Sequence, residues 1–166
     1  SGFSHSERKA IFVGDFVNRG PEIRTTLQII REMTGMGSAI ALLGNHEINA
    51  LLYSMKRDKK GPLLSVSGKR YGSVAETVLQ FKNFPEEWKD YRKWLRSLPL
   101  FYESDGLRVV HACWKDDHIR LLREELFMEI IPKSIFRDLV LDSKSALSQS
   151  ILQTTRGINL IMPPNL

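Results

Sequence analysis

The sequence has little cysteine and no long hydrophobic run. Cys113 is the one cysteine among 166 residues, so a disulfide within the chain is excluded and a reducing cytoplasm is the expected location. No uninterrupted apolar run approaches the ~20 residues that a membrane-spanning helix needs, so no membrane partner is expected. Residues 1–10 are polar and lack the apolar core of a secretory signal. With 42% hydrophobic and 26% charged residues, the composition is that of a globular protein and excludes a disordered tail or a collagen.

The net charge of +5 is concentrated in one stretch of the sequence. Between residues 51 and 72, six basic side chains stand against one acid, Asp58, and this imbalance accounts for the whole excess. The six are Lys56, Arg57, Lys59, Lys60, Lys69 and Arg70. A protein that coats nucleic acid more often spreads its positive charge over a face, so nucleic acid is not an expected partner. A solvated loop and a binding site for a small anion both fit such a patch.

Three short apolar runs predict buried strands, at residues 11–13, 40–43 and 108–110. Each run is too short for a helix and ends abruptly in polar or glycine residues. Near-continuous apolar character, without polar alternation, is typical of a strand that is covered on both faces. The three runs therefore indicate strands inside the fold rather than at its surface.

A helical pattern separates the first two runs. Pro21 suits the first turn of a helix, where its missing N–H costs nothing. Apolar residues then recur at helical spacing over residues 23–33, and Gly35 and Gly37 end the pattern. Strand, helix and strand within about 33 residues predict a βαβ unit.

Further helices are predicted beyond the second strand. They cover residues 73–98, with a break at 83–85, and then residues 117–130 and 134–154, divided by Pro132. The third strand lies between these two groups of helices. The predicted fold class is therefore α/β, with a mainly helical excursion between the second and third strands.

Polar residues follow each predicted strand. The first strand is followed by GDFVNRG from Gly14, the second by GNHE from Gly44, and the third by HACW from His111. In open α/β sheets, ligands bind at the carboxyl ends of the strands. We therefore expect Asp15, Asn45 and His111 to converge at one edge of the sheet.

The residue types at this edge suit metal and phosphate binding. An Asp carboxylate can bridge two divalent cations about 3.5–4 Å apart. An Asn oxygen is a neutral ligand, and a His imidazole suits zinc, iron and related metals. Arg19 offers a planar fork of donors for phosphate oxygens. His46, next to Asn45, is positioned to donate a proton to a leaving oxygen.

Each of these residues alone also has a plainer interpretation. Asp15 could cap the following helix, the glycines could serve only as turns, and a histidine after a strand is more often an ordinary hydrogen-bonded residue than a ligand. The occurrence of all three motifs in this order favours the metal and phosphate interpretation. A zinc-protease motif starting at His46 fails, because Ala50 stands where its second histidine is needed. Cys113 as a nucleophile is less favoured than Cys113 as a packing residue.

On GDFVNRG, GNHE and VVHACW, the sequence resembles the calcineurin-like metallophosphoesterase superfamily, in the branch of serine/threonine protein phosphatases and dinucleoside tetraphosphatases. The resemblance extends over most of residues 8–157. It implies a β-sandwich flanked by helices, in α-β-β-α layers. It also implies a two-metal centre, at which a bridging water or hydroxide attacks phosphorus in line. The LPLFYESDGLR segment before the third motif is more similar to bacterial dinucleoside-polyphosphatase-type members.

The resemblance implies a role for each matching residue. Asp15 would bridge both metals, and Asn45 and His111 would bind the second metal. Arg19 would hold the phosphate, and His46 would protonate the leaving group. The implied cofactors are divalent metal ions, either manganese, iron, zinc or nickel, because oxygen and nitrogen ligands accept all four.

Two motifs of the family do not occur in this sequence. No G-D-x-H-G strand precedes the first predicted strand, and no histidine follows His118, so only half of the usual ligand set is present. We expect residues 1–166 to form a single calcineurin-like phosphoesterase domain that is incomplete at both ends, in a fragment of a longer chain. The alternative is a truncated relative that has lost the first metal site and binds a phosphate-bearing ligand or a protein without catalysis. If the first strand of the family is missing, neighbouring strand edges are left exposed. Exposed strand edges favour self-association.

Asn18 departs from the family, which usually has an aspartate there, paired with the catalytic histidine. Asparagine keeps an acceptor but lacks the charge, so the pKa of His46 should be lower and turnover of poor leaving groups slower. Asn18 is therefore an expected catalytic residue, together with His46 and Arg19. The change Asn18→Asp should raise the rate.

The expected reaction is hydrolysis of a phosphoester or phosphoanhydride bond. The substrate would be a dinucleoside polyphosphate, another phosphorylated small molecule or a phosphoprotein. Lys59, Lys60 and Arg70 follow the GNHE motif closely enough in sequence to bind a polyphosphate tail, and they are the expected substrate-binding residues besides Arg19.

Overall fold

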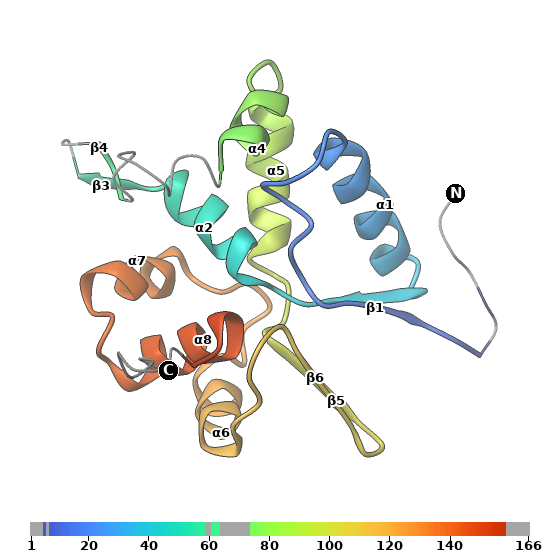
Figure 1. The fold of residues 1–166 in the computed structure, drawn as a ribbon, viewed down its shortest axis with the longest axis vertical. Coiled ribbons are helices and arrows are strands. Elements are labelled where there is room, and N and C mark those ends of the chain that lie inside the picture. The colour runs from blue at the N-terminus through green and yellow to red at the C-terminus, as the bar shows by residue number, and fades with distance from the viewer. Residues whose placement is uncertain (1–4, 6, 59–60, 64–73, 159–166) are drawn as a thin grey trace, which may run out of the picture.

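β1 (Ala10–Phe12) and β2 (Ala39–Ala41) pair in parallel, and α1 (Ile23–Gly35) connects them (Figure 1). The coordinates are those of a computed structural model, which describes residues 5, 7–58, 61–63 and 74–158. The buried face of α1 consists of the apolar residues whose spacing predicted it, namely Ile23, Leu27, Ile30 and Met33. The predicted βαβ unit is therefore confirmed, although the helix starts two residues after Pro21.

The excursion after the second strand is mainly helical, as predicted. α2 (Asn45–Tyr53) leads into a short antiparallel pair, β3 (Lys56–Asp58) and β4 (Gly61–Pro62). α4 (Ala75–Gln80) and α5 (Pro85–Leu95) follow. The predicted break between these two helices is confirmed. It coincides with Pro85 at the start of α5, where the absent N–H leaves no hydrogen bond unmade.

The third predicted strand is one arm of a hairpin, and the prediction that it is covered on both faces is wrong, because Leu107 and Arg108 are exposed. β5 (Phe101–Ser104) pairs antiparallel with β6 (Leu107–Val110), and Asp105 and Gly106 form the turn with φ values of 44° and 82°. Residues 101–104 carry no apolar run and were not predicted as a strand. Their pairing depends on the turn, because two left-handed residues match the twist of a two-residue hairpin.

Three helices follow the hairpin, where two were predicted. They are α6 (Asp116–Glu125), α7 (Lys133–Leu141) and α8 (Ala146–Arg156). The prediction of one helix over residues 134–154 is wrong, because Ser145 caps α8 by accepting a hydrogen bond from the Ser148 N–H at 3.3 Å. A serine that satisfies a free N–H at a helix start competes with the continuous helix.

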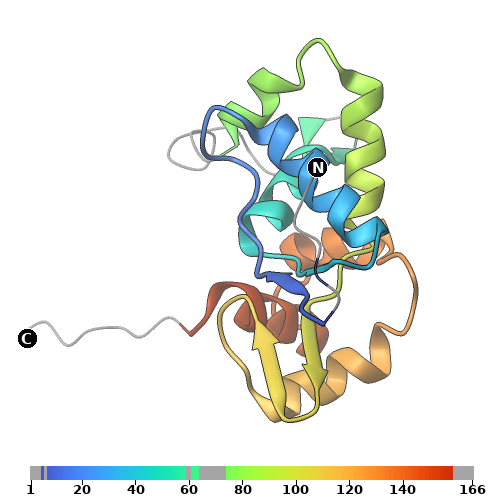
Figure 2. The same ribbon diagram turned by 90° about the vertical axis from the view of Figure 1, so that its right-hand side faces the viewer.

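The two main strand pairs are joined through the backbone beyond β2. The Leu42 N–H donates to Phe12 O at 2.8 Å, and the Leu43 N–H donates to Pro99 O at 2.9 Å. The segment before β5 therefore lies against the end of β2. Figures 1 and 2 show α1 beside α5 on one side of this junction, and the β5–β6 hairpin with α6 and α8 on the other.

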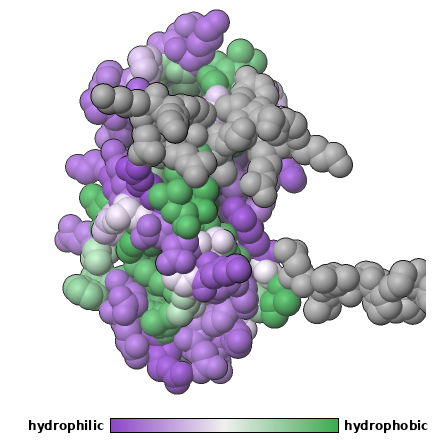
Figure 3. Space-filling model, turned by 90° about the vertical axis from the view of Figure 1, so that its left-hand side faces the viewer, coloured by the Kyte–Doolittle hydropathy of each residue, from purple (hydrophilic) through white to green (hydrophobic). Residues whose placement is uncertain are grey.

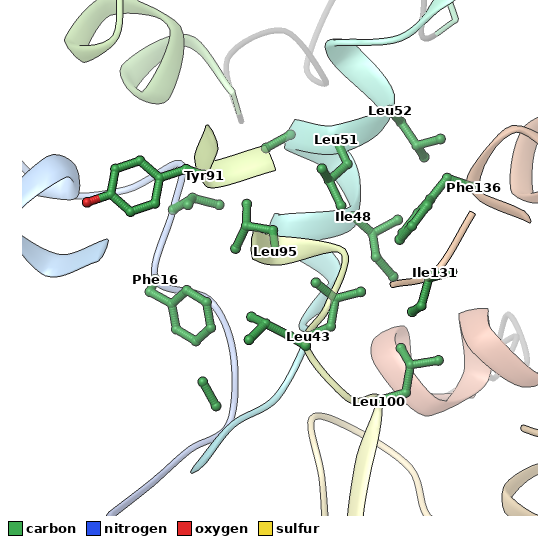
Figure 4. Close-up of a cluster of buried hydrophobic side chains, with 14 of the residues drawn as sticks. Phe16, Leu43, Ile48, Leu51, Leu52, Tyr91, Leu95, Leu100, Ile131 and Phe136 are labelled. Carbon is green, nitrogen blue, oxygen red and sulfur yellow. The ribbon is translucent and has the colours of Figure 1, made fainter. Parts of the chain in front are cut away.

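The hydrophobic core lies where α2 and α5 meet the carboxyl end of β2 (Figure 4). Leu43, Ile48 and Leu95 are fully buried, and Phe136 of α7 closes the cluster from the other side. The predicted α/β class is confirmed. None of the helices in the described part of the chain is long and apolar enough to cross a membrane.

Candidate active site

The loop after β1 is held in an unusual backbone conformation. Gly14, Asp15, Asn18 and Gly20 have positive φ values of 101°, 64°, 70° and 85°. Left-handed geometry is costly for residues other than glycine, although Asp and Asn tolerate it best. Such conformations persist only where the surroundings enforce them, and they concentrate at functional sites.

The loop after β1 and the loop after β2 are in contact at Gly14 and Gly44. A Cβ atom on Gly14 would lie 2.7 Å from Gly44 Cα and 2.9 Å from His111 Nδ1. A Cβ atom on Gly44 would lie 2.7 Å from Glu47 Oε2. The absence of side chains at both positions therefore lets the three loops approach one another closely.

We expect Gly14→Ala to destabilise the fold by about 2 kcal/mol or more, from left-handed strain and the contact with Gly44 together. Gly106→Ala is the matched control, because Gly106 also has a positive φ, of 82°, but nothing lies within 4 Å of an added Cβ. Urea unfolding of both variants measures the difference. Equal losses of stability in the two variants would show that the close approach of Gly14 to Gly44 contributes nothing to the stability of the fold.

Glu47 ties the first two loops together. Its carboxylate accepts hydrogen bonds from the N–H groups of Asp15 at 2.9 Å, Phe16 at 2.9 Å, Val17 at 3.3 Å and Gly44 at 3.0 Å. The side chain has no exposed surface. Burial raises the pKa of Glu47, and these backbone donors oppose that shift. This role was not predicted, although the GNHE motif itself carries the signal. Glu47 stands at the third position of α2, from which its carboxylate reaches back to the N–H of the N-cap residue, Gly44.

The structure brings Asp15, Asn45 and His111 together, as the sequence predicted. His111 Nε2 lies 3.1 Å from Asn45 Oδ1 and 3.5 Å from Asp15 Oδ1. The other ring nitrogen, Nδ1, is 2.6 Å from Val13 O. A carbonyl oxygen only accepts, so Nδ1 carries a proton and donates it there. In the neutral ring, the lone pair of Nε2 then faces the two oxygens.

This arrangement fits a divalent cation. When the His111 ring is neutral with its proton on Nδ1, two oxygens and one nitrogen face one another as acceptors, and a cation is the species that such lone pairs bind. A histidine that binds metal commonly donates its second N–H to a backbone carbonyl, as His111 does to Val13. No three His, Cys, Asp or Glu side chains gather into a metal-binding group within the described residues, so the Asn45 oxygen is required as the third donor.

His46 lies beside this cluster. Its Nε2 is 4.0 Å from Asp15 Oδ2, and its backbone N–H donates to Asp15 Oδ1 at 3.4 Å. Burial lowers the pKa of His46, Asp15 opposes this shift, and the charges of Arg19 and His111 add to it. The direction agrees with the sequence-based expectation, but the main cause is burial.

Asn18 contacts His46 through the backbone. Its Nδ2 donates to His46 O at 2.9 Å, and its Oδ1 accepts from Thr77 Oγ1 at 2.8 Å. The Asn18 N–H also donates to Thr77 Oγ1 at 2.8 Å. The imidazole Nδ1 of His46 is buried and has no hydrogen-bond partner among the described residues. Asn18→Asp would therefore add a charge near His46 but lose the bond to its carbonyl, a cost that the sequence did not reveal.

The predicted phosphate-binding residues are only partly described. Arg19 is exposed, and its positive charge is close enough to lower the pKa of His46. Lys59, Lys60 and Arg70 lie outside the described residues. Thr77, which no motif marked, joins the site because α4 packs its hydroxyl against the loop after β1.

A family model described as calcineurin-like phosphoesterase matches residues 3–145. The chain belongs to this family. Membership accounts for the three motifs and their order, and it agrees with the α/β fold. The resemblance predicted from GDFVNRG, GNHE and VVHACW is therefore confirmed at the level of the family.

Within the calcineurin-like phosphoesterases, the chain is similar to proteins named symmetrical bis(5'-nucleosyl)-tetraphosphatase. The protein of Aromatoleum aromaticum is 33% identical over 129 residues, which are 75% of this chain and 42% of the relative. That of Burkholderia thailandensis is 31% identical over 102 residues, 61% of this chain and 30% of the relative. That of Nitrosomonas europaea is 26% identical over 130 residues, 75% of this chain and 42% of the relative. The chain thus spans less than half the length of these relatives. The similarity to them confirms the predicted tetraphosphatase branch.

Proposed function

We propose that the protein hydrolyses phosphoanhydride bonds of dinucleoside polyphosphates, using divalent metal ions. The observation that carries the proposal is the convergence of Asp15 Oδ1 and Asn45 Oδ1 on His111 Nε2, at 3.5 and 3.1 Å. The relatives named symmetrical bis(5'-nucleosyl)-tetraphosphatase support this substrate class. A cytoplasmic location is part of the proposal, because Cys113 is the one cysteine of the sequence.

In this proposal, Asp15, Asn45 and His111 hold a metal ion. When bound, such an ion supplies Lewis acidity toward a phosphoryl oxygen. The hydrogen bond from His111 Nδ1 to Val13 O keeps the ring in the orientation and tautomer that ligation requires. The buried Glu47 carboxylate fixes the two loops that carry Asp15 and Asn45, so the donors are held in position before any ligand arrives.

Arg19 and His46 act on the substrate in this proposal. The Arg19 guanidinium, exposed at the end of the loop, binds phosphate oxygens through paired N–H donors. His46 holds a proton at Nε2, near Asp15 Oδ2, and gives it to the leaving oxygen. A phosphate brought close by Arg19 adds negative charge beside His46, and this raises the pKa of the ring and favours its protonated form.

The test measures hydrolysis of diadenosine tetraphosphate and of a chromogenic phosphate monoester by the complete protein. Chelation of metal ions should lower both rates by at least about 100-fold, because the Lewis-acid contribution is lost. Added Mn²⁺ should restore them. Full activity in the chelator would contradict the metal-dependent hydrolase. Binding of diadenosine tetraphosphate without hydrolysis, in the presence of Mn²⁺, would favour the non-catalytic module instead.

A further inference from the structure

A cavity with many polar residues in its lining lies at the other end of α2 from the candidate active site. It has a volume of about 640 Å³ and is bordered by the C-terminal end of α2, by α5 and by α7. Asn45 and Tyr53, at the two ends of α2, are separated by about 12 Å along the helix axis, from the rise of 1.5 Å per residue. The cavity is therefore separate from the cluster of Asp15, Asn45 and His111.

The lining of this cavity is strongly basic. Of the described residues that border it, seven are Lys or Arg, and two are Glu or Asp. Both acids are engaged in ion pairs, Asp90 with Arg31 of α1 at 2.6 Å and Glu86 with Lys89 at 2.9 Å. Arg31 does not border the cavity, so its pairing with Asp90 leaves the basic side chains of the lining in excess.

The cavity is basic because two of the three acids of α5 pair with arginines of α1, and not with the bases that border the cavity. Its acidic residues Glu87 and Asp90 pair with Arg24 and Arg31 of α1. Its basic residues recur at spacings of three and four, which places them on one face of a helix. They are Lys89, Arg92, Lys93 and Arg96, and all four border the cavity.

Arg92 is the centre of this basic face. Its Nε is buried and has no hydrogen-bond partner among the described residues. Burial lowers the pKa of Arg92, and the neighbouring Arg96 lowers it further. Arg96 is positioned by a hydrogen bond from its Nη1 to Ile131 O at 3.1 Å. Two guanidinium groups one helical turn apart repel each other, and an anion between them would relieve that repulsion and satisfy the Nε.

Other elements extend the basic surface around the cavity. Lys133 and Arg137 border it from α7, and Lys56 borders it from β3. Leu51 and Met55 add apolar surface. Figure 3 shows the side of the molecule that lies to the left in Figure 1, where hydrophobic residues gather near the centre with hydrophilic residues around them. The volume is that of a small-molecule site, which spans about 300–1,000 Å³.

We propose that this cavity binds the oligophosphate chain of a small molecule, as in a nucleoside triphosphate or inorganic tripolyphosphate. Cations on three elements match a chain of several phosphates better than one phosphate, because successive oxygens can reach different elements. The apolar residues Leu51 and Met55 offer a surface for a base, which only the nucleotide would use. The site goes beyond the proposed hydrolysis, since it shares no residue with the candidate active site.

The test is calorimetric binding of tripolyphosphate and of ATP to the complete protein in EDTA, where no hydrolysis is measured. Arg92→Gln combined with Arg96→Gln should weaken binding of both by about tenfold or more, from the loss of charge-assisted hydrogen bonds. The matched control is Arg120→Gln with Lys144→Gln, which removes the same charge from exposed positions on other parts of the chain. It should change affinity less than about twofold at physiological salt.

The results distinguish a site for a nucleotide from a site for a phosphate chain, and they distinguish a loss of binding from a loss of folding. Tighter binding of ATP than of tripolyphosphate would identify a nucleotide site, and equal binding would identify a site for the phosphate chain alone. Without ligand, the arginine variant should melt at a temperature close to that of the unmodified protein, because the removed repulsion offsets the lost hydrogen bond from Arg96 to Ile131 O. If that variant does not fold, Lys89→Gln with Lys93→Gln, both exposed, should weaken binding about threefold or more. No binding by the unmodified protein, or equal binding by the folded variants, would overturn the proposal.

Discussion

Replacing Asp15 by asparagine should lower the rate of diadenosine tetraphosphate hydrolysis by about 100-fold or more while leaving the fold intact. The carboxylate supplies the only negative charge among the three converging donors, so its loss weakens the attraction of a divalent cation. Asparagine tolerates the left-handed backbone, with its φ of 64°, that residue 15 adopts. The rate and the affinity for Mn²⁺ should therefore fall together, without a loss of thermal stability.

Asp105→Asn is the control for this change. Asp105 also has a positive φ, of 44°, but it lies in the turn between β5 and β6. Its substitution should leave the rate within about twofold of the unmodified protein, as expected for a surface change away from the site. If Asp15→Asn retained the rate of the control, the role of Asp15 as a metal ligand would be refuted.

Replacing Glu47 by alanine should destabilise the fold by about 3–5 kcal/mol. Four backbone N–H groups would lose their acceptor at once, in a position where the side chain has no exposed surface. Glu47→Gln should also destabilise, because its amide NH₂ would face N–H donors where the carboxylate accepts. Activity should fall with stability, since the loops that carry Asp15 and Asn45 would no longer be tied together.

Urea unfolding of Glu47→Gln beside Glu124→Gln measures this effect. Glu124 is exposed on α6, so the control removes one negative charge at little cost, within about 0.5 kcal/mol. Glu47→Gln could lose no more unfolding free energy than the control. That result would mean that water or other groups replace the carboxylate, and that Glu47 does not hold the two loops together.

The sequence predicts the parts of the fold and site that depend on local patterns. The strands at residues 11–13 and 40–43, the helix between them and the convergence of Asp15, Asn45 and His111 follow from apolar runs and from the rule that ligands bind at strand ends. The positions of Asp15 and Asn45 need only short stretches of sequence and one general property of parallel sheets. His111 joins them from the separate antiparallel pair of β5 and β6, and not from the same sheet as predicted. The strands, the helix and the convergence reappear in the structure, with shifts of one or two residues at the boundaries.

The features that were not predicted depend on contacts between distant residues. Glu47 bonds to the N–H groups of residues that precede it by about 30 positions, and Thr77 bonds to Asn18 across 59 positions. Neither partner can be identified from the spacing in one sequence. The basic face of α5 was missed for a related reason. Its acids balance its bases in the charge count, and only the packing of Glu87 and Asp90 against α1 separates them.

The central claim is that Asp15, Asn45 and His111 bind one divalent cation. It is tested most directly by a crystal structure of the complete protein grown with Mn²⁺, with anomalous diffraction recorded at the manganese edge. The account predicts an anomalous peak about 2.2 Å from Asp15 Oδ1, Asn45 Oδ1 and His111 Nε2, the usual length of such bonds. Fully occupied manganese elsewhere, with these three atoms still 3 Å or more from any ion, would contradict it.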